Sequence, residues 1–206
     1  MNLEKLKTAE AEFFALYPKG FDDEVLQPLI RRHNTAKIGQ QVRELFAEKN
    51  FVQPEEVCDN FAKIVSKSSL ISLFEKPRVR DMVRQMSPEH KDMLSIALYE
   101  LLHGSEEEGF EGLVEALSFY KLAKWSIVTL IPYYYARDRA FFIKPTTTKN
   151  IIKYFELDGL EYKPRPSYAF YRKYTKALEE MKSEVDASLG KNNAGFTGFL
   201  MMAMEG

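Results

Sequence analysis

Apolar residues recur at steps of three and four along most of the first 123 residues, which is the spacing of one helix face. Two of these stripes have clear helix starts. Ser87, Pro88 and Glu89 supply a capping hydroxyl, a ring with a preset φ and a first-turn acid. Ser105 and Glu108 match a capping box. The pattern predicts a mainly α, multi-helix, bundle-like globular protein.

The pattern changes after residue 121. Residues 125–131 are apolar almost all round, which favours a buried helix ended by Pro132. Two aromatic segments, residues 133–135 and 140–143, then flank a charged turn. Their side chains suit a small two-stranded hairpin near residues 133–143, and an extended crossing is the alternative.

Two further helix starts occur in the last third of the chain. Three threonines follow Pro145, and one of them is expected to cap a helix. Ser167 is expected to cap a long last helix that ends at Gly190. Its inner face would carry the seam Tyr171, Tyr174, Leu178, Met181, Val185 and Leu189.

The chain has no long linker rich in Gly, Ser or Pro, which predicts a single domain over residues 1–206. The alternative is two subdomains that meet near Lys121. Residues 1–121 would then be acidic and helical, and residues 122–206 would be aromatic and basic, with an apolar tail.

Charge separates the same parts of the chain. Residues 124–174 hold thirteen of the aromatic residues, ten Lys or Arg and four acids, which gives this segment a net charge of +6. The whole chain has a net charge of −1, so the remainder carries −7. A basic, tyrosine-rich block in an acidic chain indicates where to look for a binding surface.

Several features predict the compartment. Cys58 is the one cysteine, so an intramolecular disulfide is excluded, which fits a reducing compartment. The first residues alternate charged and apolar side chains, unlike a signal peptide. The longest apolar runs are far shorter than a membrane-spanning helix requires. We therefore expect a soluble, cytoplasmic protein with no membrane partner.

The first candidate binding site is the segment KPTTTKNIIKYF. Lys144, Thr146, Thr147, Lys149 and Lys153 would surround a helix N-terminus, where backbone N–H groups and the helix dipole favour a phosphate. The alternative is a threonine cap with solvated lysines, which is favoured because a glycine-rich phosphate loop is missing.

The second candidate is the run YKPRPSYAFYRKY. Arg165, Tyr168, Arg172 and Lys173 combine the stacking surfaces and charges that bind nucleic acid. Tyr171 and the following seam residues are expected to be core instead. A helix-turn-helix fits poorly, because the connection before Ser167 is too long.

The C-terminal tail is apolar, and it is too short to span a membrane. Phe196, Phe199, Met201 and Met202 are expected to dock, either on their own chain or on a partner. Docking on the chain itself is the favoured alternative, and a homodimer contact is the other.

Catalytic candidates are few. His33, His90 and His103 are not spaced as paired metal ligands on a helix, and Cys58 lies among apolar neighbours. Neither a metal nor a cofactor is predicted. An enzyme of unknown class remains an alternative that the sequence disfavours.

The segment FFIKPTTTK, residues 141–149, resembles a segment of an uncharacterised bacterial protein family. The resemblance implies that residues 125–174 form a unit, and it transfers no activity. The leading hypothesis is a non-catalytic interaction protein that uses its tyrosine-rich face and apolar tail to bind a protein partner or a second copy. The alternative is binding of nucleic acid or a phosphate ligand through the basic residues of 144–173.

Overall fold

The structure, a computed structural model, describes residues 1–204, and every regular element in that part of the chain is helical. This confirms the mainly α prediction. The first half forms α1 (Leu3–Leu16), α2 (Gln27–His33), α3 (Thr35–Leu45), α4 (Pro54–Lys67), α5 (Glu75–Gln85) and α6 (Pro88–His103). The second half forms α7 (Glu106–Ser118), α8 (Trp125–Val128), α9 (Leu130–Tyr135), α10 (Pro145–Tyr154), α11 (Tyr168–Ser183) and α12 (Asn193–Ala203).

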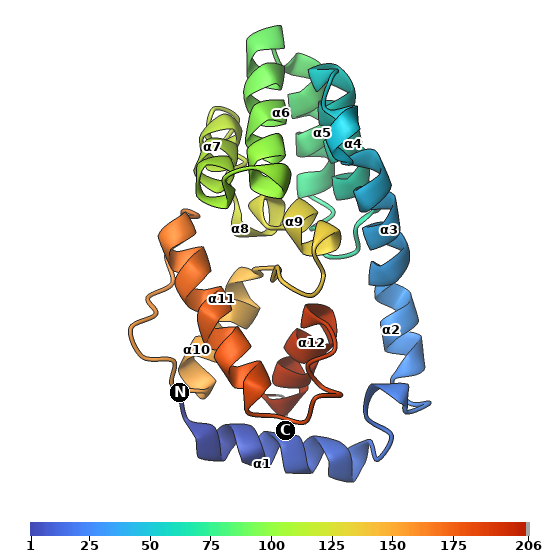
Figure 1. Ribbon diagram of the computed structural model, residues 1–206, viewed down its shortest axis with the longest axis vertical. Coiled ribbons are helices and arrows are strands. Elements are labelled where there is room, and N and C mark those ends of the chain that lie inside the picture. The colour runs from blue at the N-terminus through green and yellow to red at the C-terminus, as the bar shows by residue number, and fades with distance from the viewer. Residues whose placement is uncertain (205–206) are drawn as a thin grey trace.

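Figure 1 shows these helices in two groups. Helices α3 to α9 form the upper group in that view, and α1, α10, α11 and α12 form the lower one. Helix α2 runs along one side from α1 toward α3. One continuous set of buried apolar side chains extends through both groups. The chain therefore starts and ends in the lower group, with the upper group inserted between.

Serine caps start three of the helices, as the sequence predicts. The hydroxyl oxygens of Ser87, Ser105 and Ser167 each accept a hydrogen bond from the backbone N–H three residues later. The capping box at Ser105 is incomplete, because its N–H donates to Glu100 Oε2 at 2.9 Å. These caps satisfy N–H groups that a helix start leaves without a backbone partner.

Helices α6 and α7 pack against one another more extensively than any other pair in residues 1–204. A glycine makes this possible. A Cβ at Gly109 would lie 2.0 Å from the backbone nitrogen of Leu101 in α6. The glycine therefore weakens the α7 helix locally but allows the two helix backbones to approach closely.

The expected hairpin near residues 133–143 is wrong, since Tyr133, Tyr134 and Tyr135 belong to α9. Residues 140–144 that follow are extended but form no strand within the described chain. The Ile143 N–H donates to Thr129 Oγ1 at 3.0 Å, so the extended segment is tied to a helix junction rather than to another strand. The alternative, an extended crossing of residues 133–143, does not describe residues 133–135 either, because they are helical.

The same junction explains why the apolar run makes two helices. Pro132 has no N–H to donate to the carbonyl four residues earlier, so α8 ends at Val128 and α9 begins at Leu130. The sequence analysis predicted that Pro132 ends a helix. The proline instead lies in the first turn of α9, which continues to Tyr135. Trp125 is buried, and its indole N–H donates to the Lys163 carbonyl at 2.7 Å.

The C-terminal tail folds as α12 on its own chain. Phe199 packs edge-on against Phe13 of α1, with ring centroids 5.5 Å apart. Asn193 is buried, and its amide donates to the Ala140 carbonyl at 3.0 Å while its side-chain oxygen accepts from Lys182 at 2.8 Å. The last long helix, α11, ends at Ser183 rather than at Gly190.

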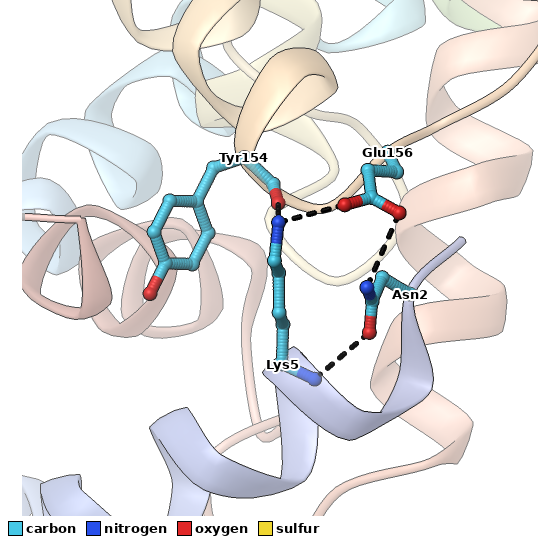
Figure 2. Close-up of polar contacts among 4 residues, drawn as sticks. All are labelled: Asn2, Lys5, Tyr154 and Glu156. Atoms are coloured by element: carbon cyan, nitrogen blue, oxygen red, sulfur yellow. Dashed lines mark hydrogen bonds and ion pairs between the residues drawn. The ribbon is translucent and has the colours of Figure 1, made fainter.

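The start of α1 is fastened to the end of α10, as Figure 2 shows. Lys5 Nζ donates to Glu156 Oε1 at 2.7 Å and to the Tyr154 carbonyl at 3.2 Å. Asn2 caps α1 and also donates to Glu156 Oε2 at 3.2 Å. Together with the packing of α1 on α12, these contacts hold the first helix in the lower group.

Contacts join residues on both sides of position 121. Helix α3 packs against α9, and α1 packs against α12. The division into subdomains 1–121 and 122–206, and the single-domain alternative, both remain predictions.

Candidate functional site

Helix α10 carries the first group of predicted ligand-binding residues. Lys144, Thr146, Lys149 and Lys153 are exposed, and Thr147 is half-buried. The predicted threonine cap is wrong, because Lys144 is the N-cap residue and no side chain in residues 1–204 caps the helix. The first turn of α10 therefore presents N–H groups beside a lysine.

One of these lysines is partly engaged within the chain. The Lys149 ammonium lies 5.7 Å from the ring centroid of Tyr162, a cation–π contact across the connection to α11. Arg165 is exposed in that same connection. The described contacts do not bring Arg165 together with the lysines of α10.

At the start of α11, the predicted binding residues meet acids of α7. The Tyr168 backbone N–H donates to Glu111 Oε1 at 2.6 Å, and its hydroxyl donates to Glu106 Oε2 at 2.9 Å. Burial and the Glu106 hydrogen bond raise the pKa of Tyr168 to about 12, while the charge of Arg172 opposes that shift. Carboxylates of the chain itself thus occupy the anion position at this helix N-terminus.

Lys173 is exposed and points into a different environment from Tyr168. It lines an open depression of about 400 Å³ between α11 and the turn at residues 157–160. Asp158 and Glu180 line the same depression, and Lys176 lies 3.9 Å from Glu180. Lysines and acids are thus mixed in the lining of this depression.

A second concentration of positive charge lies where α2 approaches the rest of the molecule. His33 Nδ1 lies 3.1 Å from the Ser69 hydroxyl, in the loop between α4 and α5. Burial lowers the pKa of His33, and the charges of Arg32 and Lys144 lower it further. We call Arg32, His33, Ser69 and Lys144 the His33 cluster.

The basic residues of the His33 cluster have no ion-pair partner in the part of the chain that the structure describes. In residues 1–204, no ion pair includes Arg32, His33 or Lys144. Arg32 is the sequence neighbour of His33 and Lys144 comes from a distant part of the chain, and both charges act on the histidine. At the start of α11, by contrast, two carboxylates accept hydrogen bonds from Tyr168.

Exposed apolar side chains lie in the two segments that form the cluster. Leu29 and Ile30 of α2 are 44% and 43% exposed, and Leu73 and Phe74 of the α4–α5 loop are 79% and 85% exposed. We call these four residues the exposed apolar set. Sequence reasoning missed α2, although Pro28 in its first turn and three basic residues in its last turn are typical helix signals.

The predicted interaction residues of the tail differ in burial. Phe196 and Phe199 are fully buried, whereas Met201 is 36% exposed and Met202 is half-buried. The tail thus docks on its own chain, the favoured alternative of the sequence analysis. The tyrosine-rich face is also largely internal, since Tyr133, Tyr134 and Tyr171 are buried.

Features of catalysis are sparse in the described part of the chain. Burial raises the pKa of the Cys58 thiol to about 12, so the thiolate is not formed at neutral pH. A shallow depression of about 190 Å³ contains Arg78, Asp81 and Tyr120, and the Asp81 carboxylate faces Arg84 at 4.0 Å. Within residues 1–204, no group of His, Cys, Asp and Glu side chains is placed to hold a metal ion.

Comparisons with protein families, curated proteins and solved structures gave no match. Across residues 1–204, no helix has both the length and the apolar character needed to cross a membrane. The His33 cluster is therefore judged by its own geometry and charge.

Proposed function

We propose that this protein is a non-catalytic binding protein that attaches to an anionic partner through the His33 cluster. Protein association is the leading case, as it is for the sequence. The observation that supports the proposal is the His33 ring, which contacts Ser69 and whose pKa is lowered by the charges of Arg32 and Lys144, neither of which forms an ion pair in the described chain. Of the other predicted cations, Lys149 lies over the Tyr162 ring, and Phe196, Phe199 and several of the tyrosines are buried.

The physical support is electrostatic. Like charges that a fold brings together repel one another, and an arriving carboxylate or phosphate would relieve that repulsion. Complementary charge also accelerates encounter with a partner of opposite sign. The start of α11 gains nothing comparable from a ligand, because Glu106 and Glu111 already supply the negative charge.

A phosphate group is the second candidate for the same cluster. Lys144 starts α10, whose first turn has no side-chain cap in the described chain. Thr146 and Thr147 could add hydroxyl donors to those N–H groups. Nucleic acid would use the same contacts repeatedly, and its binding would depend steeply on salt.

The test compares two charge reversals on exposed arginines. A fluorescent oligoglutamate peptide is titrated with the wild-type chain, Arg32→Glu and Arg172→Glu at low and at physiological salt. We expect salt-sensitive binding that Arg32→Glu weakens roughly tenfold and Arg172→Glu changes by less than about twofold. Circular dichroism checks that both variants are folded. Equal losses in the two variants, or binding that ignores salt, would overturn the proposal.

A further inference from the structure

We infer that the segment recognised by this surface is an acidic protein segment with regularly spaced apolar side chains, which lies along α2. Its acids would meet the His33 cluster, and its apolar side chains would cover the exposed apolar set. This inference rests on the proposed function, because it names the class of anionic partner. It goes further by assigning roles to Leu29, Ile30, Leu73 and Phe74.

The first support is the orientation of α2. Leu26 at its start is buried, and His33 at its end contacts Ser69, so this side of the helix faces the molecule. Leu29 and Ile30 lie between those two anchors at helical steps of three and four, and hence on the same side. They nevertheless remain 44% and 43% exposed. The rest of the chain therefore covers these two side chains only partly.

The second support is the fixed backbone that carries Leu73 and Phe74. The Phe74 N–H donates to Ser72 Oγ at 3.3 Å, and Phe74 is the N-cap residue of α5. The neighbouring Glu75 accepts from Lys124 at 2.7 Å. Two large apolar side chains are thus displayed from an ordered helix start, which differs from a loose terminus.

The third support is charge complementarity, which selects an acidic occupant. Helix α2 has no acid in its first turn and carries Arg31, Arg32 and His33 in its last turn. A second copy in a two-fold dimer would bring this basic surface against itself, so like charges would oppose that dimer. A small phosphate could neutralise the cluster but would leave the exposed apolar set in water.

A flat anionic bilayer fits less well than a protein segment. Leu29 and Ile30 lie on the side of α2 that faces the molecule, where a planar surface cannot reach them. A narrow chain with protruding side chains can reach such a position, as apolar anchors of a peptide do in a groove-type contact. The observations therefore favour an acidic amphipathic protein segment.

The test uses the full chain and two synthetic peptides of equal length and equal glutamate content. One peptide carries Leu at every third or fourth position, and the other carries Ser there. We expect the Leu peptide to bind roughly tenfold more tightly, because apolar contacts add to the charge attraction. Leu73→Ser and Phe74→Ser should remove most of that advantage. Leu16→Ser, at another exposed leucine, should preserve it.

The outcomes separate the two proposals. Equal affinity for both peptides, with loss of both in Arg32→Glu, would refute the amphipathic segment and leave the proposed function standing. Binding that neither Arg32→Glu nor salt weakens would refute the proposed function itself. Binding to phosphatidylserine vesicles that depends on Phe74 would indicate a membrane as the partner. Self-association that Phe74→Ser abolishes would indicate a second copy of the chain. Both of those outcomes would overturn the inference.

Discussion

The start of α11 and the His33 cluster contain similar side chains but differ in what surrounds them. At α11, Tyr168 bonds to two acids of α7, and a carboxylate takes the place that a ligand anion would fill. At the His33 cluster, the charges of Arg32 and Lys144 lower the pKa of the histidine, and neither residue forms an ion pair in the described chain. Composition counts the charges, but tertiary packing decides which of them remain available to a partner.

The difference depends on where the α6–α7 hairpin directs its acids. Phe110 of α7 stacks on Tyr171 of α11, with ring centroids 5.1 Å apart, and the α7 first turn brings Glu106 beside the same helix. Two acids from the acidic first part of the chain thus bond to Tyr168 of the basic segment across a helix contact. The His33 cluster lies outside that contact, where α2 runs along one side of the molecule from α1 toward α3 (Figure 1).

The largest effect is expected from Gly109→Ala, which disturbs the helix pair that positions those acids. The new Cβ would lie 2.0 Å from the Leu101 nitrogen and 2.4 Å from its Cα, so the helices must separate. Backbone atoms cannot swing aside as a flexible side chain can. We expect a loss of about 2–4 kcal/mol in the free energy of unfolding, measured by urea denaturation.

Gly198→Ala in α12 is the matched control. A Cβ there would meet no atom of the described chain within 4 Å. Alanine should therefore stabilise that helix by roughly 0.5–1 kcal/mol through its higher helix propensity. Equal stability of wild type and Gly109→Ala would contradict the close approach of α6 and α7.

A smaller effect, but one aimed directly at the comparison, is expected from the double variant Glu106→Gln/Glu111→Gln. It removes the two carboxylates that bond to Tyr168, and should lower the free energy of unfolding by about 1–2 kcal/mol. It should also expose the α11 start to external anions. The oligoglutamate peptide should then gain a second binding site that Arg172→Glu abolishes.

Glu107→Gln/Glu108→Gln controls for charge and for the helix dipole. Both residues are exposed in the same first turn, and neither carboxylate has a hydrogen-bond partner within residues 1–204. This control should create no second site. If both double variants behaved alike, the general negative charge of the α7 first turn, rather than the two contacts with Tyr168, would explain why the start of α11 does not bind the peptide.

Local signals in the sequence were sufficient for several elements. A cap is set by residues three apart, so Ser87, Ser105 and Ser167 could be read without the fold. The seam of α11 follows from helical spacing, and its Tyr171 and Tyr174 are buried as expected. Such features need only neighbours in sequence.

Other features depend on distant neighbours and were missed. Tyr133 to Tyr135 have β-forming side chains, but burial in α9 and the Thr129–Ile143 hydrogen bond outweigh that propensity. Lys144 was recognised as a candidate, whereas Arg32, His33 and Ser69 were not. Their meeting depends on the path of α2 along the side of the molecule, and spacing along the chain carries no information about that path.

The smallest effect concerns the protonation of His33, and it tests directly whether the cluster is short of negative charge. Burial, Arg32 and Lys144 lower the His33 pKa below the ordinary value of 6.5. Histidine ring-proton NMR should show this depressed pKa, and Arg32→Gln should move it upward. Between the lowered pKa and 6.5 the unfolded chain binds more protons than the folded one, so stability should rise with pH across that window.

A bound acidic peptide should reverse the shift. Its carboxylates would favour the charged imidazole, so the His33 pKa should rise on binding, and by linkage binding should strengthen as pH falls through the same window. His103 provides the internal comparison, because its ring bonds to the Phe46 carbonyl away from the cluster. An unchanged His33 pKa in Arg32→Gln and in the peptide complex would mean that charge repulsion does not govern this site. The contrast between the His33 cluster and the neutralised α11 start would then fail.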